Sequence, residues 1–144
     1  MANYYANART NYFKVKDIEA FKTAIEDYPL EVVSRDDNPE FVALFVPDDS
    51  DDGSFPWCDF YTDDADGDEI DWTFIFKRHL QENSVVIIQE VGNEKQRYFG
   101  GIAVAINSKG EEIIININSI FDQALSLGEV IDFWGNKVEP KEAN

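Results

Sequence analysis

An acidic segment in the middle of the chain most constrains what this sequence can fold into. Between Asp36 and Asp71 lie 14 of the 29 acidic residues, with no lysine or arginine among them. The aromatic residues within or directly after this run are Phe55, Trp57, Phe60, Tyr61 and Trp72. Disordered acidic segments are poor in aromatic residues. We therefore predict a folded anionic surface at about residues 47–71, fastened to the body of the domain by its aromatic side chains.

The rest of the composition is that of a single globular domain spanning residues 1–144. Hydrophobic residues make up 44% of the chain and aromatic residues 14%, and a chain of this length buries roughly two thirds of its unfolded surface. The formal net charge is -17. A negative field of this size disfavours direct binding to nucleic acid or to an anionic membrane. We therefore expect the partner to be a cationic protein surface.

The sequence carries no secretory signal pattern and no apolar run of the roughly 18 residues that a membrane span needs. Its single cysteine, Cys58, excludes an internal disulfide and fits a reducing compartment. These features predict a cytoplasmic protein. Both a monomer and a homodimer stay open, because an apolar edge strand at Ile113–Ile117 could pair across a dimer.

Hydrophobic periodicity and turn residues predict an α+β fold. Strands are expected at residues 11–15, 30–34, 40–46, 84–91, 97–107, 111–117 and 130–134. Helices are expected at residues 17–28, 68–80 and 119–128. We predict an antiparallel sheet with helices packed on one face, in which a ferredoxin-like βαββαβ start is followed by a β-hairpin and a C-terminal helix.

Polar residues mark the expected helix starts. Asp17 and Asp68 are suitable N-caps for the first two helices, and Asp71 would then occupy the third position of the second helix. Ser119 marks the start of the third helix. In the strand at 97–107, the small side chains of Ala103 and Ala105 leave room for a helix to pack closely.

The run Asp63–Glu69 has some features of a calcium-binding loop. If Gly67 takes the sixth position, Thr62 stands at position 1 and Thr73 at position 12, where such loops have a bidentate glutamate. The pattern therefore fails at both ends, and we expect no specific metal site. A calcium-binding or purely structural module stays open as a second alternative function.

No catalytic motif is present. Cys58 and His79 stand in no recognisable motif, and the carboxylates around the cysteine disfavour its reactive thiolate. One histidine and one cysteine are too few for a typical zinc site. Gly100-Gly101 lacks the spacing and the lysine of a phosphate-binding loop. We expect no catalytic residue and no cofactor, so that the protein is not an enzyme.

Two segments, Asn11–Asp17 and Arg97–Val104, are similar to small acidic proteins that phages and plasmids carry, of the anti-CRISPR and antirestriction kind. The resemblance implies an inhibitor that occupies the DNA-binding channel of a nuclease. Duplex DNA carries one charge per ~1.7 Å of its axis. Carboxylates spaced every one to three residues approach that density, so the acidic segment would act as a DNA mimic.

The predicted partner is thus a basic nucleic-acid-binding protein, a nuclease or an effector complex. Trp57 and Tyr61 are candidates for exposed aromatic contacts within the acidic surface. The complete set of predicted partner-binding residues is Asp48, Asp49, Asp51, Asp52, Asp63, Asp64, Asp66, Asp68, Trp57 and Tyr61. The main alternative is an immunity protein or antitoxin that neutralises a basic toxin.

Overall fold

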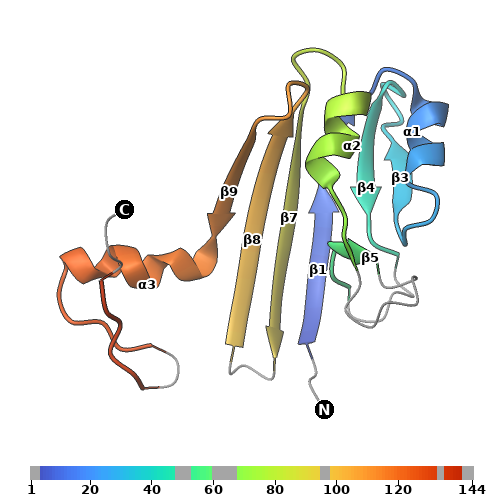
Figure 1. Cartoon of the computed structure of the whole chain (residues 1–144). Coiled ribbons are helices and arrows are strands. Elements are labelled where there is room, and N and C mark those ends of the chain that lie inside the picture. The colour runs from blue at the N-terminus through green and yellow to red at the C-terminus, as the bar shows by residue number, and fades with distance from the viewer. Residues whose placement is uncertain (1–3, 48–52, 60–67, 95–97, 133–134, 141–144) are drawn as a thin grey trace.

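The computed structural model describes residues 4–47, 53–59, 68–94, 98–132 and 135–140 (Figure 1). Within these residues, one seven-stranded sheet and one two-stranded sheet are present. The large sheet contains β1 (Tyr4–Thr10), β2 (Phe13–Lys14), β3 (Glu31–Ser34), β4 (Phe41–Phe45), β7 (Val85–Glu94), β8 (Tyr98–Asn107) and β9 (Glu112–Asn116). The small sheet pairs β5 (Cys58–Asp59) with β6 (Asp68–Glu69), and the helices are α1 (Ile18–Ala24), α2 (Trp72–His79) and α3 (Ile120–Gln123).

The large sheet is antiparallel, and its strands run in the order β3-β4-β1-β7-β8-β9, with β2 also paired to β4. Helices α1 and α2 lie on one face, over the half of the sheet that contains β3, β4, β1 and β7 (Figure 1). The structure is therefore α+β, with an antiparallel sheet and these two helices on one face.

Aromatic rings fill the core between the helices and the sheet. The Phe13 ring meets the Phe21 and Phe76 rings edge-on, at centroid distances of 5.8 and 5.7 Å. Trp72 stacks on Phe76 at 5.7 Å. All four side chains are buried, and edge-to-face ring pairs add to the stabilisation that burial itself gives. The core thus joins β2 to both helices.

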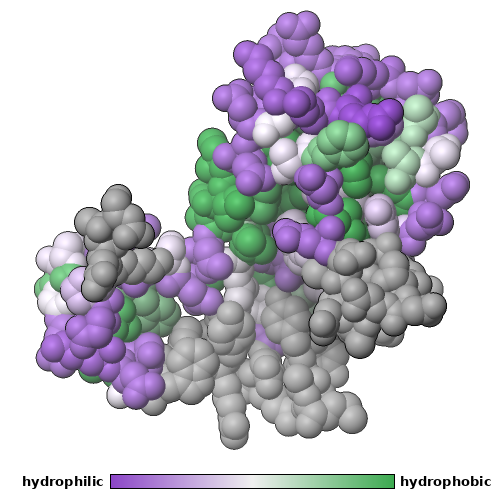
Figure 2. Space-filling view, in the orientation of Figure 1, coloured by the Kyte–Doolittle hydropathy of each residue, from purple (hydrophilic) through white to green (hydrophobic). Residues whose placement is uncertain are grey.

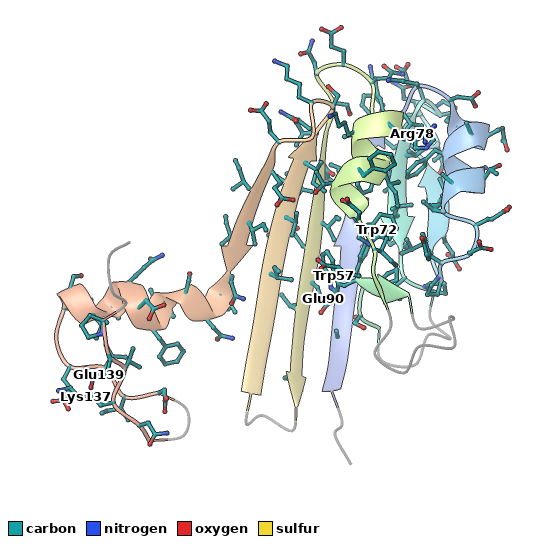
Figure 3. The ribbon with its side chains drawn as sticks, viewed as in Figure 1. Trp57, Trp72, Arg78, Glu90, Lys137 and Glu139 are labelled. Carbon is teal, nitrogen blue, oxygen red and sulfur yellow. The ribbon has the colours of Figure 1, made fainter. Side chains whose placement is uncertain are left out.

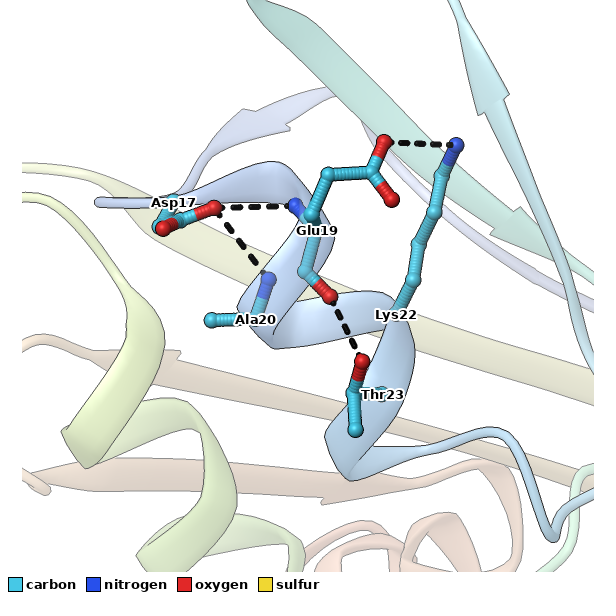
Figure 4. A network of polar contacts seen from close by, with 5 residues as sticks. All are labelled: Asp17, Glu19, Ala20, Lys22 and Thr23. Atoms are coloured by element: carbon cyan, nitrogen blue, oxygen red, sulfur yellow. Dashed lines mark hydrogen bonds and ion pairs between the residues drawn. The ribbon is translucent and has the colours of Figure 1, made fainter.

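The first helix begins where the sequence predicts. The Asp17 carboxylate accepts hydrogen bonds from the backbone N–H groups of Glu19 and Ala20, at 3.0 and 3.2 Å (Figure 4). These two donors have no partner within the helix, so the cap stabilises its first turn. The helix ends at Ala24 instead of residue 28, because the N–H of Ile25 is shared between two carbonyl groups and the following residues form turns.

The first strand is not the one that the sequence predicts. β1 covers Tyr4–Thr10 and pairs with β7 over its whole length. Of the expected strand at residues 11–15, only the two residues of β2 are in a strand. Asn11 ends the pairing with β7: its side chain accepts from the N–H of Ile87 and donates to the carbonyl of Val85. Asn11 therefore turns the chain away from β7 and into β2.

The start of the second helix also differs from the prediction. Asp71 caps α2 by accepting from the N–H of Phe74 at 3.0 Å. Asp68, which was expected to cap it, pairs with Asp59 in the β5–β6 hairpin. The nearer aspartate caps the helix because the chain is still extended at Asp68.

The C-terminal part does not form one helix on the sheet. The expected helix at 119–128 is divided into η1 (Ile117–Ser119), α3 and η2 (Ala124–Ser126), and Ser119 makes no side-chain cap. An isolated bridge between Ile131 and Lys137 replaces the expected strand at 130–134. This arm, residues 117–140, projects away from the sheet (Figure 1). No helix among the described residues packs on Ala103 and Ala105.

Candidate partner-binding surface

Most of the predicted partner-binding residues lie outside the described parts of the chain. These are Asp48, Asp49, Asp51, Asp52, Asp63, Asp64, Asp66 and Tyr61. Their role in binding stays a prediction. The structure describes the backbone of Asp68, in β6, and the whole of Trp57. It also describes the residues that tie the acidic segment to the sheet.

The first tie is a close approach of backbone to backbone. The chain enters this part of the fold at Gly53, whose φ is +78°. A Cβ at this position would lie 2.0 Å from the carbonyl oxygen of Ala6 in β1. Only glycine satisfies both the positive φ and the contact. Gly53, which follows the stretch 48–52 in sequence, therefore lies directly against the sheet.

The second tie is a buried carboxylate on β7. Oε1 of Glu90 accepts hydrogen bonds from the backbone N–H of Phe55 at 2.6 Å and from the indole N–H of Trp57 at 3.1 Å (Figure 3). Glu90 is only 8% exposed. A buried carboxylate is costly unless it is hydrogen-bonded, and each donor would be costly if its acceptor were removed. Glu90 therefore fixes residues 55–57 on the sheet.

The third tie closes the stretch 60–67 at its base. The chain leaves the described region at Asp59 and returns at Asp68, and these two residues pair in the β5–β6 hairpin. Next to the hairpin, the N–H of Ile70 donates to the carbonyl of Trp57 at 2.9 Å. Asp59 and Asp68, which flank this acidic stretch, are thus held side by side.

Aromatic packing connects these ties to α2. The Phe55 ring lies 5.0 Å from the Trp57 ring and 5.1 Å from the Trp72 ring. The indole N–H of Trp72 donates to the carbonyl of Pro56 at 2.9 Å. These contacts agree with the predicted role of the aromatic residues as anchors. Trp57 in particular is half-buried and packs on the core, so only part of its ring is available for a partner.

A groove opens beside this anchor, between α2 and β9. Its volume is about 670 Å³. Apolar side chains line much of it, and Figure 2 shows a hydrophobic area over β8 and β9. The apolar lining residues are Trp57, Ile70, Trp72, Ile88, Ile102, Val104, Ile106 and Ile114. Glu69, Asp71 and Glu112 also line it, and the Thr73 hydroxyl donates to Glu112 at 2.6 Å across it. The groove is therefore apolar with acidic side chains among its lining.

Charge is distributed unevenly along α2. Asp71 stands at its N-terminus, next to the acidic segment, while Lys77, Arg78 and His79 occupy its last turn. Both ends suit the helix dipole. Burial lowers the pKa of His79, and the charges of Arg78 and of Lys16 lower it further. The C-terminal end of α2, with its cations, lies roughly 10 Å from Asp71, because that is about the length of the helix.

The structure bears on three further sequence expectations, which concern a Cys58–His79 pair, a metal site and a membrane-spanning helix. Cys58 follows the Trp57 anchor near the start of α2, whereas His79 is the last residue of that helix. In the described ranges, no three His, Cys, Asp or Glu side chains are grouped to hold a metal ion; the possible calcium loop, Asp63–Glu69, falls mostly outside them. None of the helices in those ranges has the length and apolar character to cross a membrane.

Sequence reasoning missed Glu90 and Gly53, the residues that make two of the three ties. Glu90 had a usable signal, because it shares the face of Val86 and Ile88 in a strand whose alternate residues point inward. An acid at such a position needs donors nearby. Gly53 had none, since its partner is a backbone carbonyl 47 positions earlier in the chain.

A comparison of the chain with protein-family models, with curated proteins and with solved structures finds no match.

Proposed function

We propose that this chain is a non-enzymatic inhibitor, of the anti-CRISPR or antirestriction kind, that acts as a DNA mimic. Its acidic segment occupies the nucleic-acid-binding surface of a basic partner, a defence nuclease or another nucleic-acid-binding protein. We infer a cytoplasmic location, because the single cysteine, Cys58, fits a reducing compartment.

The observation that carries the proposal is the attachment of the acidic segment at several points. Gly53 lies against β1, Glu90 binds residues 55–57, and the β5–β6 hairpin joins the ends of the stretch 60–67. A binding segment that is already held in place loses less conformational entropy when it binds. A disordered acidic tail would need none of these contacts.

The charge of the segment supports the same function. Of the fourteen acids, Asp37 and Glu40 form ion pairs with Arg35 and Lys14. The other acids of this base-free run produce a local field that attracts a cationic cleft, speeds association and weakens as salt rises. A cleft lined with lysine and arginine cannot distinguish a carboxylate from a phosphate by charge alone. The cations in the last turn of α2 stand at the opposite end of that helix from Asp71, the last acid of the segment.

We also infer that residues 4–94 follow the ferredoxin-like order, with the acidic segment inserted before the second helix. The antiparallel neighbours β3-β4-β1-β7 support this inference. So do the positions of α1 between β1 and β3, and of α2 between β4 and β7. In that arrangement the insertion starts from a central strand, which gives it a rigid base.

The groove favours a second candidate, an immunity protein or antitoxin that neutralises one basic toxin. An electrostatic mimic of DNA needs no apolar contact, whereas a cognate protein partner is recognised through apolar contacts at the centre of its interface. Ile102, Val104 and Ile114 offer such contacts beside Glu69 and Asp71. A toxin that is recognised through this groove would keep its own DNA bound, because its nucleic-acid site is not occupied.

Displacement of DNA tests the proposal and separates the two candidates. Labelled duplex DNA is bound to each of a panel of basic nucleases and effector complexes, and this protein is titrated in. A DNA mimic displaces the duplex, and displacement weakens as salt rises. If the protein binds a panel member without displacing its DNA, the proposal of a DNA mimic is wrong and the cognate-toxin candidate gains support. If it binds no member, both candidates lose support.

Matched charge variants test the assignment to the segment. The first variant changes Asp48, Asp49, Asp51 and Asp52 to asparagine. At about 0.5 kcal/mol per exposed charge pair, its affinity should fall by about thirtyfold. The control changes four acids outside the segment, Glu19, Glu26, Asp27 and Glu129, and should bind almost as tightly as the wild type. Equal losses in both variants would show that only net charge matters.

A further inference from the structure

The face of the sheet opposite α1 and α2 differs from the rest of the molecule in its charge. Residues that alternate with the buried Val86 and Ile88 point to this far face. Among the described side chains that β1, β7, β8 and β9 place there, none is acidic, although the chain has 29 acids. The only charged one is Arg9. On β3, Glu31 pairs with Phe45, which pairs with Arg9, so the acid-free part of the face is the part formed by β1, β7, β8 and β9. An acidic protein that keeps this part of the sheet free of acids has reason to cover it.

Exposed apolar side chains gather on the β7–β9 part of this far face. They are Val85, Ile87, Val91, Ile113, Ile115 and Ile117. Single exposed apolar residues are ordinary, but a contiguous patch larger than a few hundred Å² marks an interaction site. The six large side chains lie on β7, on β9 and at the start of η1, on either side of β8, and together form a patch of this kind.

The shape of this patch is a ridge beside a trough. β8 contributes only small residues to it, with Ala103 opposite Ile115 and Ala105 opposite Ile113 in the pairing with β9. A Cβ added to Gly101 would lie 3.1 Å from Cγ2 of Ile117. The β9 isoleucines therefore stand above a floor of glycine and alanine. A trough next to a ridge of similar length is a shape that can fit a copy of itself.

We propose that this face binds a second copy of the chain, with the two sheets packed face to face about a two-fold axis. The isoleucine ridge on β9 of each copy lies in the β8 trough of the other. Face-to-face sheets pack ~10 Å apart with interdigitating side chains, and a two-fold interface uses the same patch twice. Ala103 and Ala105 then leave room for the isoleucines of the second copy.

Charge argues for a second copy in this orientation despite the net charge of -17. The buried Glu90 points to the helix-bearing side of the sheet, and Glu69 and Asp71 line the groove between α2 and β9 on that side. In the dimer these acids face outward, separated by both sheets and the ~10 Å between them. That exceeds the ~8 Å screening length at physiological ionic strength. Added salt should therefore strengthen the dimer.

Sedimentation equilibrium over a wide range of protein concentration tests the proposal. The wild type should move from 16.5 kDa to twice that mass as concentration rises, and more readily at high salt. Binding to a cationic partner has the opposite dependence on salt, so failure of the dimer and failure of the proposed function are distinguishable. A wild type that stays monomeric throughout, at low and high salt, overturns the proposal.

Three variants locate the interface. Ile115→Asp places a charge on the ridge and should raise the dissociation constant at least about a hundredfold. Ala103→Leu fills the trough and should also weaken the dimer, although it makes the face more apolar. Leu127→Asp, at an exposed position on the arm, is the control and should dimerise like the wild type. Circular dichroism confirms folding, and an Ile115→Asp protein that is folded and still dimeric overturns the proposal.

Discussion

The two halves of the sheet use similar apolar strands in opposite environments. In β4, Val42, Ala43 and Leu44 are 0% exposed, because helices cover one face and other side chains cover the other. In β9, Ile113, Ile114 and Ile115 are 57% to 67% exposed. The three central residues of each strand are all apolar, so side-chain type does not account for the difference. β4 lies inside the sheet under the helices, whereas β9 is an edge strand that α1 and α2 do not cover.

This comparison separates what stabilises the monomer from what is available for binding. The covered half, defined as β1–β4, β7 and β8 with α1 and α2, contains the aromatic core and the ties of the acidic segment. The uncovered half, defined as β9 and the arm, carries most of the large exposed apolar side chains. Changes in the covered half should therefore affect folding, and equivalent changes in the uncovered half should affect it little.

The largest expected difference is between core and edge side chains. Phe76→Ala removes a ring that contacts Phe13, Phe21 and Trp72 and should lower the free energy of unfolding by about 3–5 kcal/mol. Ile114→Ala, in β9, should lower it by less than about 1 kcal/mol. Urea denaturation followed by circular dichroism measures both. Similar losses for the two variants would mean that β9 is part of the monomer core.

Next in size is the effect of adding a methyl group at a glycine. Gly53→Ala should cost about 2–4 kcal/mol, because the new Cβ meets the carbonyl of Ala6 and φ is positive. Gly135→Ala, in the arm, has a similar φ but nothing within 4 Å of the new Cβ. It should cost only about 1 kcal/mol, from backbone strain alone. Thermal and urea unfolding measure the loss of stability in both variants. The difference between the two losses is the cost of the contact between the new Cβ at position 53 and β1.

Helix caps give a smaller difference. Asp71→Ala removes the hydrogen bond to the N–H of Phe74 and should lower the free energy of unfolding by about 1 kcal/mol. Ser119 makes no cap at α3, and its hydroxyl donates only to the carbonyl of Asn116 at an exposed position. Ser119→Ala should therefore change the free energy of unfolding by no more than about 0.5 kcal/mol. The two variants are compared in the same urea series. A larger effect at Ser119 would contradict the separation between the halves.

The smallest expected effect depends on pH. Burial, Arg78 and Lys16 lower the pKa of His79 in the folded protein, so the unfolded chain binds its proton more readily. The stabilisation from neutral His79 is present above the unfolded pKa of about 6.5 and is lost as pH falls through the lower, folded pKa. The melting temperature of the wild type should therefore fall further than that of His79→Gln between pH 7.5 and pH 5.5. Parallel curves would show that His79 is not linked to folding.

Local patterns in the sequence were sufficient for the elements that local contacts determine. Asp17 and the apolar stripe behind it identified α1, and the alternation in residues 84–117 identified β7, β8 and β9. The α+β class followed from these elements. The prediction that a helix packs closely on Ala103 and Ala105 was wrong for the described residues, because both side chains point to the face opposite α1 and α2.

Elements that depend on distant partners were missed. β1 has the sequence Tyr-Tyr-Ala-Asn-Ala-Arg-Thr, which has no strong strand pattern, and it is a strand because it lies between β4 and β7. The two-residue strands β5 and β6 are too short to show a period. The capping error at Asp68 arose because two aspartates three positions apart both suit an N-cap. The role of Glu90 depends on residues about 35 positions away in sequence.

The central claim is that Glu90 fixes residues 55–57 of the acidic segment on the sheet, and hydrogen exchange of the Phe55 amide tests it most directly. This N–H donates to Glu90 Oε1. In the wild type and in Glu90→Gln, which retains that oxygen, the amide should exchange slowly; in Glu90→Ala it should exchange much faster. Exchange of the wild-type Phe55 amide at the rate of an unstructured peptide would contradict the account.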